Sequence, residues 1–331
     1  MVFEALPLLF LFSAPGHLCF ANIALSVDVV LHPFLDADEH LVEVAEPRPL
    51  AGLERHLLED LGAGIAVLVV PETNGRSRGE YALKIIQKNI ELAKKKSQPL
   101  CQDTGSILFY IHYPRKMDAE LLGKLAKKAV VASTKKGYLR QNSVDSLTGE
   151  NNGTNVGPGT PTLHLEPWKK DHIEVKLMLK GGGCENVGAQ YSLPDSRIGA
   201  GRDLNGVKKC ILDAVQQAQG KGCGPGVLGV IVGGDRATGY LASKEQFLRR
   251  MRDKNPNPVL AKLEEECLGE ANQLGIGPMG FGGKTTLMGV KVGALNRLPA
   301  SFFVSVSYMC WAFRRQGAKV SARGEIQKWL Y

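Results

Sequence analysis

The sequence lacks any apolar segment long enough to cross a membrane. Its longest apolar run, residues 6–12, contains Pro7 and is much shorter than the roughly 20 residues that a membrane helix needs. The run resembles a secretion signal only superficially, because no lysine or arginine precedes it and Pro7 and Pro15 interrupt it. We therefore expect no transmembrane helix and no association with a membrane.

Cysteine is also scarce, with seven residues dispersed over a chain of 331. A disulfide scaffold is excluded, because such frameworks belong to short chains that are dense in cysteine. This usage is typical of a reducing compartment, and we expect a cytoplasmic protein.

Basic residues are nearly absent from the beginning of the chain. Residues 1–60 contain ten acidic side chains against Arg48 and Arg55, and no lysine occurs before Lys84. The rest is strongly basic, so that the whole chain has a formal net charge of +8. We interpret residues 1–75 as an atypical N-terminal extension and residues 80–331 as one domain.

The sequence contains no recognition motif for nucleic acid, and its lysines are scattered. The basic charge therefore favours small anionic ligands over nucleic acid. With 44% hydrophobic and 22% charged residues, the composition excludes a disordered, collagen-like or coiled-coil protein. Glycine is abundant, with 38 residues, and its clusters indicate places where the backbone approaches another group closely.

The hydrophobic periodicity indicates an α/β fold. Apolar residues recur at helical spacing in some segments and alternate, or run together, in others. The two kinds of segment are intermixed along the chain, which is the pattern of an α/β protein. Residues 149–162, rich in glycine, asparagine and proline, are expected to form a long loop. The predicted helices are 81–96, 118–136, 205–219 and 257–274, and the predicted strands are 107–113, 173–179, 227–232, 285–293 and 302–309.

Three cysteines, Cys101, Cys223 and Cys310, occur where a predicted element meets a loop. Their separations match no short zinc or ferredoxin pattern, so that spacing alone leaves open both a shared metal site and separate buried thiols. Cys210 and Cys267 fall on apolar helix faces and are expected in the core. A further thiol, Cys184, directly follows three glycines and fits either role.

The glycine-rich segment 275–286 superficially resembles a phosphate-binding loop. Pro278 occupies the position of the first required glycine, and residues 285–292 alternate like a strand where a helix should begin. A nucleotide-binding loop is therefore excluded, whereas a close backbone approach to an anionic ligand remains open.

Read together, these segments resemble the α subunit, or N-terminal half, of the iron-sulfur class I fumarate hydratase and L-tartrate dehydratase family. The matching pieces follow the family order from about residue 80 to the C-terminus, and residues 1–75 do not match. They are Cys101-Gln102-Asp103-Thr104-Gly105, Leu139-Arg140, residues 152–159, glycines 181–183, the Cys223 turn with residues 230–234, residues 275–286, and Pro299-Ala300-Ser301 leading to Cys310-Trp311.

The resemblance implies mixed sheets flanked by helices, the α-type domain of an iron-sulfur hydro-lyase. It implies a 4Fe-4S cluster held by Cys101, Cys223 and Cys310, with Cys184 as the reserve ligand. One iron without a protein ligand would be a Lewis acid toward a small dicarboxylate substrate. The resemblance further implies substrate binding by Gln102, Arg140 and Gly182 and a catalytic role for Asp103.

The sequence departs from the family in two respects. The family often has a histidine at the position of Leu298, and neither His164 nor His172 is an obvious substitute. The chain ends at Tyr331, so that the family's second half, which contributes to the site, is missing. We therefore expect activity only with a β subunit, in an oligomer of α–β pairs. The fumarate–malate reaction is the leading hypothesis; L-tartrate dehydration and an inactive cluster-binding homologue are the alternatives.

Overall fold

The computed structural model describes residues 78–96, 100–321 and 324–331, and the expected N-terminal extension lies outside them. The chain divides into two compact units, and each draws on separate stretches of sequence. The first unit comprises residues 88–179 and 314–331, and the second comprises residues 180–313 with residues 78–87. Helix α3 (Arg78–Lys96) begins in the second unit and ends in the first. The expectation that residues 80–331 act as one domain stays a prediction.

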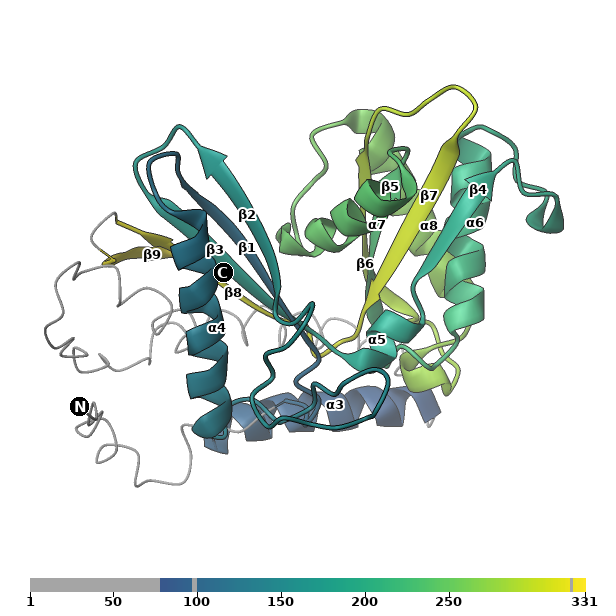
Figure 1. The fold of residues 1–331 in the computed structure, drawn as a ribbon. Coiled ribbons are helices and arrows are strands. Elements are labelled where there is room, and N and C mark those ends of the chain that lie inside the picture. Colours follow the sequence, from purple (N-terminus) through teal and green to yellow (C-terminus); the bar gives the residue numbers. More distant parts are fainter. Residues whose placement is uncertain (1–77, 97–99, 322–323) are drawn as a thin grey trace, which may run out of the picture. The chain divides into compact units, whose positions relative to one another are not determined.

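The first unit is built on a five-stranded mixed sheet in the order β2-β1-β3-β8-β9 (Figure 1). β1 and β2 are parallel, whereas β8 is antiparallel to both β3 and β9. Its strands are β1 (Ser106–Pro114), β2 (Thr162–Trp168), β3 (Ile173–Lys180), β8 (Arg314–Val320) and β9 (Ile326–Trp329).

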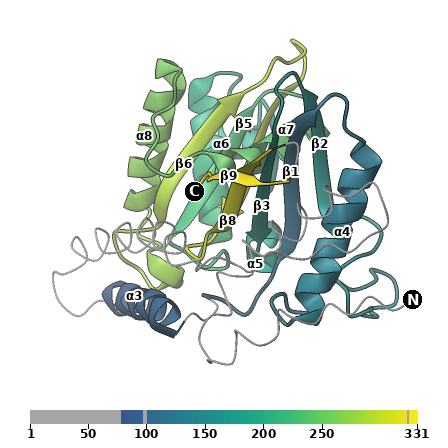
Figure 2. The same cartoon turned by 90° about the vertical axis from the view of Figure 1, so that its left-hand side faces the viewer.

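Helix α4 (Ala119–Lys135) covers one face of this sheet (Figure 2). Asp118 caps its first turn by accepting a hydrogen bond from the backbone N–H of Glu120 at 2.8 Å, and Gly137 follows its end with a φ of +73°. Leu122 and Val130 of α4 pack with the odd-numbered residues of β1 and β3, because alternate residues of a strand face the same side. The apolar residues between α4 and the sheet form the core of the first unit.

The second unit is built on a four-stranded mixed sheet in the order β4-β7-β5-β6. β5 is parallel to β6 and antiparallel to β7, which also pairs antiparallel with β4. Its strands are β4 (Ala189–Leu193), β5 (Gly226–Val232), β6 (Leu287–Ala294) and β7 (Phe302–Met309).

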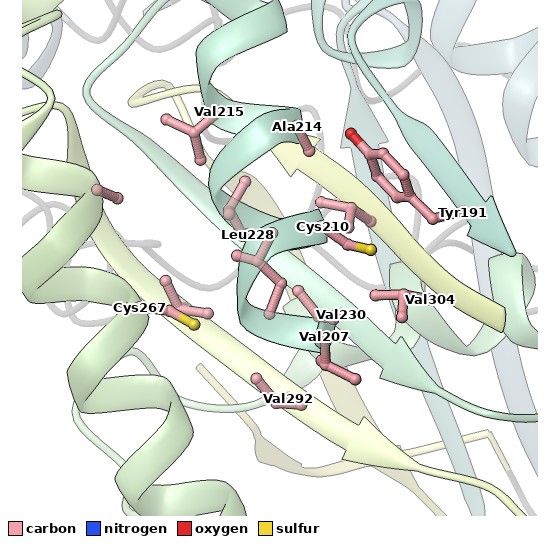
Figure 3. Packing of buried hydrophobic residues seen from close by; sticks show 14 of the residues in the cluster. Tyr191, Val207, Cys210, Ala214, Val215, Leu228, Val230, Cys267, Val292 and Val304 are labelled. Atoms are coloured by element: carbon pink, nitrogen blue, oxygen red, sulfur yellow. The ribbon is translucent and has the colours of Figure 1, made fainter. Parts of the chain in front are cut away.

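Helices α6 (Leu204–Ala218) and α8 (Pro258–Gln273) bury their apolar faces on one side of this sheet (Figure 3). Cys210 of α6 and Cys267 of α8 are fully buried in this cluster, which confirms the prediction that both are core residues. Burial raises the pKa of each thiol to about 12, so both stay protonated and unreactive at neutral pH.

The opposite side of the same sheet is more polar and is covered by α7 (Arg236–Glu245). Ser243 of α7 and Ser307 of β7 join their hydroxyls at 2.7 Å. Short helices complete the unit: α5 (Gly182–Asn186), η3 (Ser196–Ile198), η4 (Gln246–Leu248) and η5 (Pro278–Gly280).

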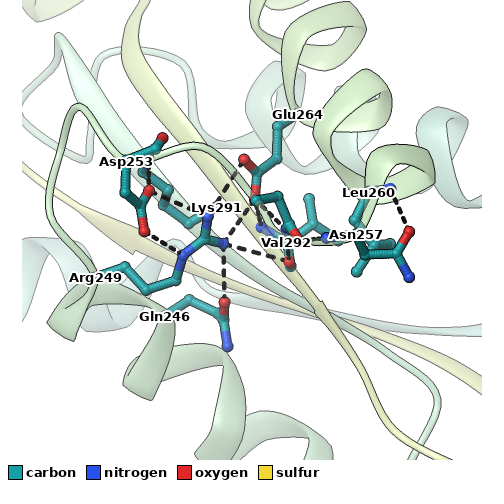
Figure 4. Close-up of polar contacts among 9 residues, drawn as sticks. Gln246, Arg249, Asp253, Asn257, Leu260, Glu264, Lys291 and Val292 are labelled. Atoms are coloured by element: carbon teal, nitrogen blue, oxygen red, sulfur yellow. Dashed lines mark hydrogen bonds and ion pairs between the residues drawn. The ribbon is translucent and has the colours of Figure 1, made fainter.

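A partly buried ionic network connects the segment between α7 and α8 to β6 (Figure 4). Arg249 donates to Asp253 at 2.9 Å and to Glu264 at 2.7 Å, and Glu264 also accepts the backbone N–H of Val292. Lys291 of β6 donates to Asp253. The network joins the segment after η4 and helix α8 to β6 of the second sheet.

The architecture confirms the predicted fold class, since both sheets are mixed and flanked by helices. Each predicted helix and strand occurs within a few residues of its expected bounds. The sequence analysis did not identify β2, β4, α7, β8 and β9. Across the described ranges, the structure contains no helix with the length and apolar character needed to span a membrane.

Candidate functional site

The turn that carries Cys223 has an unusual backbone. Gln219 and Cys223 adopt positive φ values of +48° and +55°, which residues with a side chain rarely do. The backbone N–H of Cys223 donates to the carbonyl of Gly220 at 3.3 Å. The carbonyl of Cys223 accepts the N–H of Trp311 at 3.4 Å, so the residue next to Cys310 is bonded to Cys223 itself.

The sheet topology explains this meeting of distant segments. β5 begins directly after the Cys223 turn, and antiparallel β7 ends directly before Cys310. Pairing of Val227 with Met309 therefore places both cysteines at one edge of the sheet. Cys223 is partly exposed there, and Cys310 is buried.

The Tyr308 ring packs against this turn, and the sequence analysis did not identify this residue. A Cβ atom added at Gly222 or Gly226 would overlap the Tyr308 ring, so the turn lies flat against the ring only because both residues are glycine. Burial raises the pKa of the Tyr308 phenol, and three nearby thiols raise it further. Those thiols belong to Cys184, Cys310 and Cys223.

The glycine-rich segment 275–286 closes a second side of the turn. The N–H of Met279 donates to the carbonyl of Gly224 at 3.0 Å, and the N–H of Gly226 donates to the carbonyl of Thr286 at 3.2 Å. At Gly277, with a φ of +70°, a Cβ would collide with the carbonyl of Gly282. The strand β6 follows this segment, which confirms the strand predicted where a phosphate-binding loop would be followed by a helix.

Glycines 181–183 approach the same turn from the end of β3. The Cys184 thiol lies 3.8 Å from the carbonyl of Gly222, and a Cβ at Gly183 would lie 3.3 Å from the carbonyl of Lys221. Gly182 is exposed, as a residue that meets a ligand through its backbone should be. The second unit thus gathers the Cys223 turn, Cys310, segment 275–286 and glycines 181–183 in one place.

The first unit gathers the remaining predicted residues in another place. Cys101 is partly exposed in the loop before β1, and Gln102 beside it is exposed. The Asp103 carboxylate accepts the N–H of Gly105 at 2.8 Å. The Thr104 hydroxyl accepts the N–H of Arg140 at 2.8 Å, which links the loop of Cys101 to the exposed Arg140.

Asn155 holds the Arg140 segment, and sequence reasoning did not single it out. Its side chain is 99% buried, and its φ is +58°. The amide nitrogen donates to the carbonyl of Arg140 at 2.8 Å and to the Thr134 hydroxyl at 3.1 Å. The amide oxygen accepts the N–H groups of Asn142 and Ser143, both at 3.0 Å. The motif at residues 152–159 therefore fixes the backbone that presents Arg140.

The predicted site residues thus fall on both units. Cys101, Gln102, Asp103 and Arg140 belong to the first unit; Gly182, Cys223 and Cys310 belong to the second. In residues 78–96, 100–321 and 324–331, no three His, Cys, Asp or Glu side chains form a group that could hold a metal ion. The shared site of Cys101 with Cys223 and Cys310 stays a prediction.

Leu298 lies away from the Cys223 turn within the second unit. It belongs to the connection between β6 and β7 and is 72% exposed. The full length of β7, roughly 24 Å for eight residues, separates that connection from Cys310. Leu298 therefore does not contact the cysteines of its own unit.

The fold and the site define an α/β protein whose strand ends carry thiols and glycine-rich loops, a combination suited to a soft metal or an anion. The chain belongs to the fumarate hydratase family, because residues 53–319 match the family described as "Fumarate hydratase (Fumerase)". This confirms the resemblance drawn from the motifs.

Individual relatives support the same assignment. The chain is 54% identical over 262 residues to a "Putative fumarate hydratase class I" of Geobacillus stearothermophilus, covering 78% of this chain and 51% of that protein. It is 33% identical over 244 residues to the "L(+)-tartrate dehydratase subunit alpha" of Escherichia coli K12, covering 72% and 78%. A "Putative L(+)-tartrate dehydratase subunit alpha" of Methanocaldococcus jannaschii is 33% identical over 238 residues, covering 70% and 82%. The chain therefore spans about half the length of the Geobacillus relative.

Proposed function

We propose that the chain is the α-type part of an iron-sulfur hydro-lyase that interconverts fumarate and malate. The observation that carries this proposal is the family match over residues 53–319 together with 54% identity to a putative class I fumarate hydratase. The identity to the two tartrate dehydratase subunits is lower, at 33%. This difference favours fumarate over L-tartrate.

Cys223 and Cys310 would hold a 4Fe-4S cluster together with Cys101, and Cys184 remains the reserve ligand. The donor set fits such a group, because thiolates are the preferred ligands of iron-sulfur clusters. The structure supports the fit through the hydrogen bond that joins Cys223 to the residue after Cys310. When bound, the cluster would supply an iron without a protein ligand as a Lewis acid.

The chain's own polar residues would bind and orient the substrate. The Arg140 guanidinium, exposed and fixed through its backbone, can bind a carboxylate by two parallel N–H bonds. Gln102 offers an exposed amide, and Gly182 offers an exposed backbone. The Asp103 carboxylate, held by the N–H of Gly105, is our candidate for moving a proton beside the substrate.

A β subunit would complete the site. The tartrate dehydratase relatives are named as alpha subunits, and the chain matches only half of the Geobacillus protein. A second chain that covers the substrate would exclude water and strengthen the electrostatic interactions inside the site. We propose an assembly of α–β pairs.

The direct test is to co-express the chain, without oxygen, with the part of the Geobacillus relative that it does not match. The purified pair should hydrate fumarate and dehydrate malate, and its kcat/KM for L-tartrate should be at least about tenfold lower, equivalent to ~1.4 kcal/mol. The chain alone, prepared in parallel, should show no turnover.

Two outcomes would replace the proposal with one of its alternatives. A pair that prefers L-tartrate would be a tartrate dehydratase. A pair that contains iron and sulfide but acts on none of these substrates would be an inactive cluster-binding homologue.

A further inference from the structure

A charged cluster with one fully buried member flanks glycines 181–183 and takes no part in the proposed cysteine site. It consists of Lys180, the last residue of β3, Glu185 of α5 and Lys244 of α7, all in the second unit. The Lys180 ammonium lies 3.2 Å from the Glu185 carboxylate, and the Lys244 ammonium donates to the same carboxylate at 2.7 Å. Two cations therefore share one anion.

Lys180 is the most deeply buried member of this cluster. Its side chain is 0% exposed, yet its ammonium makes no hydrogen bond with good geometry to any described residue; the contact with Glu185 is an ion pair only. Burial lowers the pKa of Lys180, and the neighbouring Glu185 opposes this shift. A buried cation with unused donors is destabilising on its own, and a further anion nearby would favour its charged form.

A second buried lysine of the same unit provides the contrast. Lys291 is also buried, but its ammonium donates to both the carboxylate and the backbone carbonyl of Asp253. Arg249 shares Asp253 but also pairs with Glu264, so the two cations of that network face two carboxylates. Lys180 and Lys244 share the single carboxylate of Glu185, which leaves one positive charge unmatched.

The unmatched charge lies beside the segment expected to meet the substrate. Lys180 directly precedes Gly181, and Glu185 follows Cys184, so the glycine segment lies between two members of the cluster. Gly182 is exposed between the buried Lys180 and the partly exposed Glu185. A net positive charge of one unit behind an exposed glycine attracts an anion to that backbone, and the low dielectric of the interior preserves the attraction.

We propose that Lys180 is a positioning residue for the dicarboxylate substrate. Its charge, which the shared Glu185 carboxylate leaves unbalanced, makes the potential at Gly182 positive. This inference rests on the proposed function. Substrate affinity should therefore follow the net charge of the cluster.

The test varies that charge in the complete α–β pair. Lys180→Met removes one positive charge at nearly constant volume and brings the net charge of the three groups to zero. KM for malate should rise at least about tenfold, while kcat stays within about threefold, because ground-state and transition-state binding are both lost. Lys291→Met is the matched control, and it should lower thermal stability without changing KM.

The double variant Lys180→Met/Glu185→Gln separates charge from packing. It returns the net charge to that of the natural cluster, so KM should recover by at least half of its rise on a logarithmic scale. If Lys180 were only structural, the second substitution would add damage. An unchanged KM in Lys180→Met, or a KM in the double variant no better than in the single one, would overturn the inference.

Two further measurements keep the test decisive. Turnover of the unmodified pair is measured first, and its absence would refute the proposed function rather than the role of Lys180. Should Lys180→Met not assemble, Glu185→Gln carries the test alone. Its cluster is more positive, so KM should equal or fall below that of the unmodified pair, and a higher KM would contradict the proposal.

Discussion

At the scale of single residues, the Tyr308 ring determines the shape of the turn that carries Cys223. The turn can lie against the ring because Gly222 and Gly226 have no side chains. The same ring is buried among the thiols of Cys223, Cys310 and Cys184. A substitution at this contact should therefore lower the stability of the protein and also shift the three thiols.

We predict that Gly226→Ala destabilises the protein by about 1–3 kcal/mol, because the new methyl group overlaps the Tyr308 ring and the backbone must shift. Urea unfolding of the complete pair would measure the loss. The variant should also retain less iron than the unmodified pair after reconstitution.

Gly269→Ala is the control for this substitution. Gly269 lies inside α8, and nothing lies within 4 Å of the position its Cβ would take. Alanine should stabilise the helix there by about 0.5–1 kcal/mol. Equal stabilities of the two variants would show that the contact with Tyr308 does not constrain the turn.

At the scale of elements, the ionic network between η4, α8 and β6 shows how charged residues hold secondary structure in place. Burial raises the pKa of Asp253, but hydrogen bonds from Arg249 and Lys291 outweigh it and hold that pKa below its usual value. The carboxylate is therefore more acidic in the folded protein than in the unfolded chain. Its contribution to stability is present above about pH 4 and is lost as the pH falls through the folded pKa.

We predict that Asp253→Asn lowers the free energy of unfolding at neutral pH by about 1–3 kcal/mol. The difference from the unmodified protein should begin to shrink below about pH 4, where Asp253 of the unfolded chain takes up its proton, and should be lost as the pH falls through the lower pKa of the folded protein. Denaturant unfolding at several pH values would measure it. Asp171→Asn, at a fully exposed carboxylate, is the control and should leave the free energy of unfolding unchanged within the error of the measurement.

A difference between Asp253→Asn and the unmodified protein that stays constant down to low pH would contradict this account. It would show that the shape of the side chain, and not its charge, carries the stabilisation.

Whether the sequence could predict a helix or strand depended on how apolar the buried face of that element is. Helix α8 was predicted well, because Asn257 caps it, Gly275 follows it and its buried face carries Leu263 and Cys267. Strand β8 was missed because Arg314 and Gln316 are buried in it, so its sequence reads as polar.

Other missed elements have similar physical reasons. In β2, Leu163 and Leu165 alternate with polar residues, but Pro167 lies inside the strand and hides the pattern. Helix α7 buries Gly239 and Ser243 against a polar sheet face, which gives no apolar stripe to detect.

At the scale of the whole molecule, the candidate site depends on contacts between segments distant in sequence. The spacing of Cys223 and Cys310 matches no metal motif, and only the register of β5 with β7 shows why the two are adjacent. Their assignment as cluster ligands is a prediction that comes from the family resemblance, because spacing alone left it open. Tyr308 and Asn155 escaped prediction because their contacts arise from burial and from partners far along the chain.

We propose that Cys101, Cys223 and Cys310 together hold an iron-sulfur cluster. The most direct measurement is the iron and sulfide content, with electron paramagnetic resonance, of the α–β pair reconstituted without oxygen. The unmodified pair should bind about four irons per α chain. Serine at any of the three positions should remove most of the iron, whereas Cys184→Ala and Cys267→Ala should retain it. Full iron content after substitution of Cys101, Cys223 or Cys310 would contradict the account.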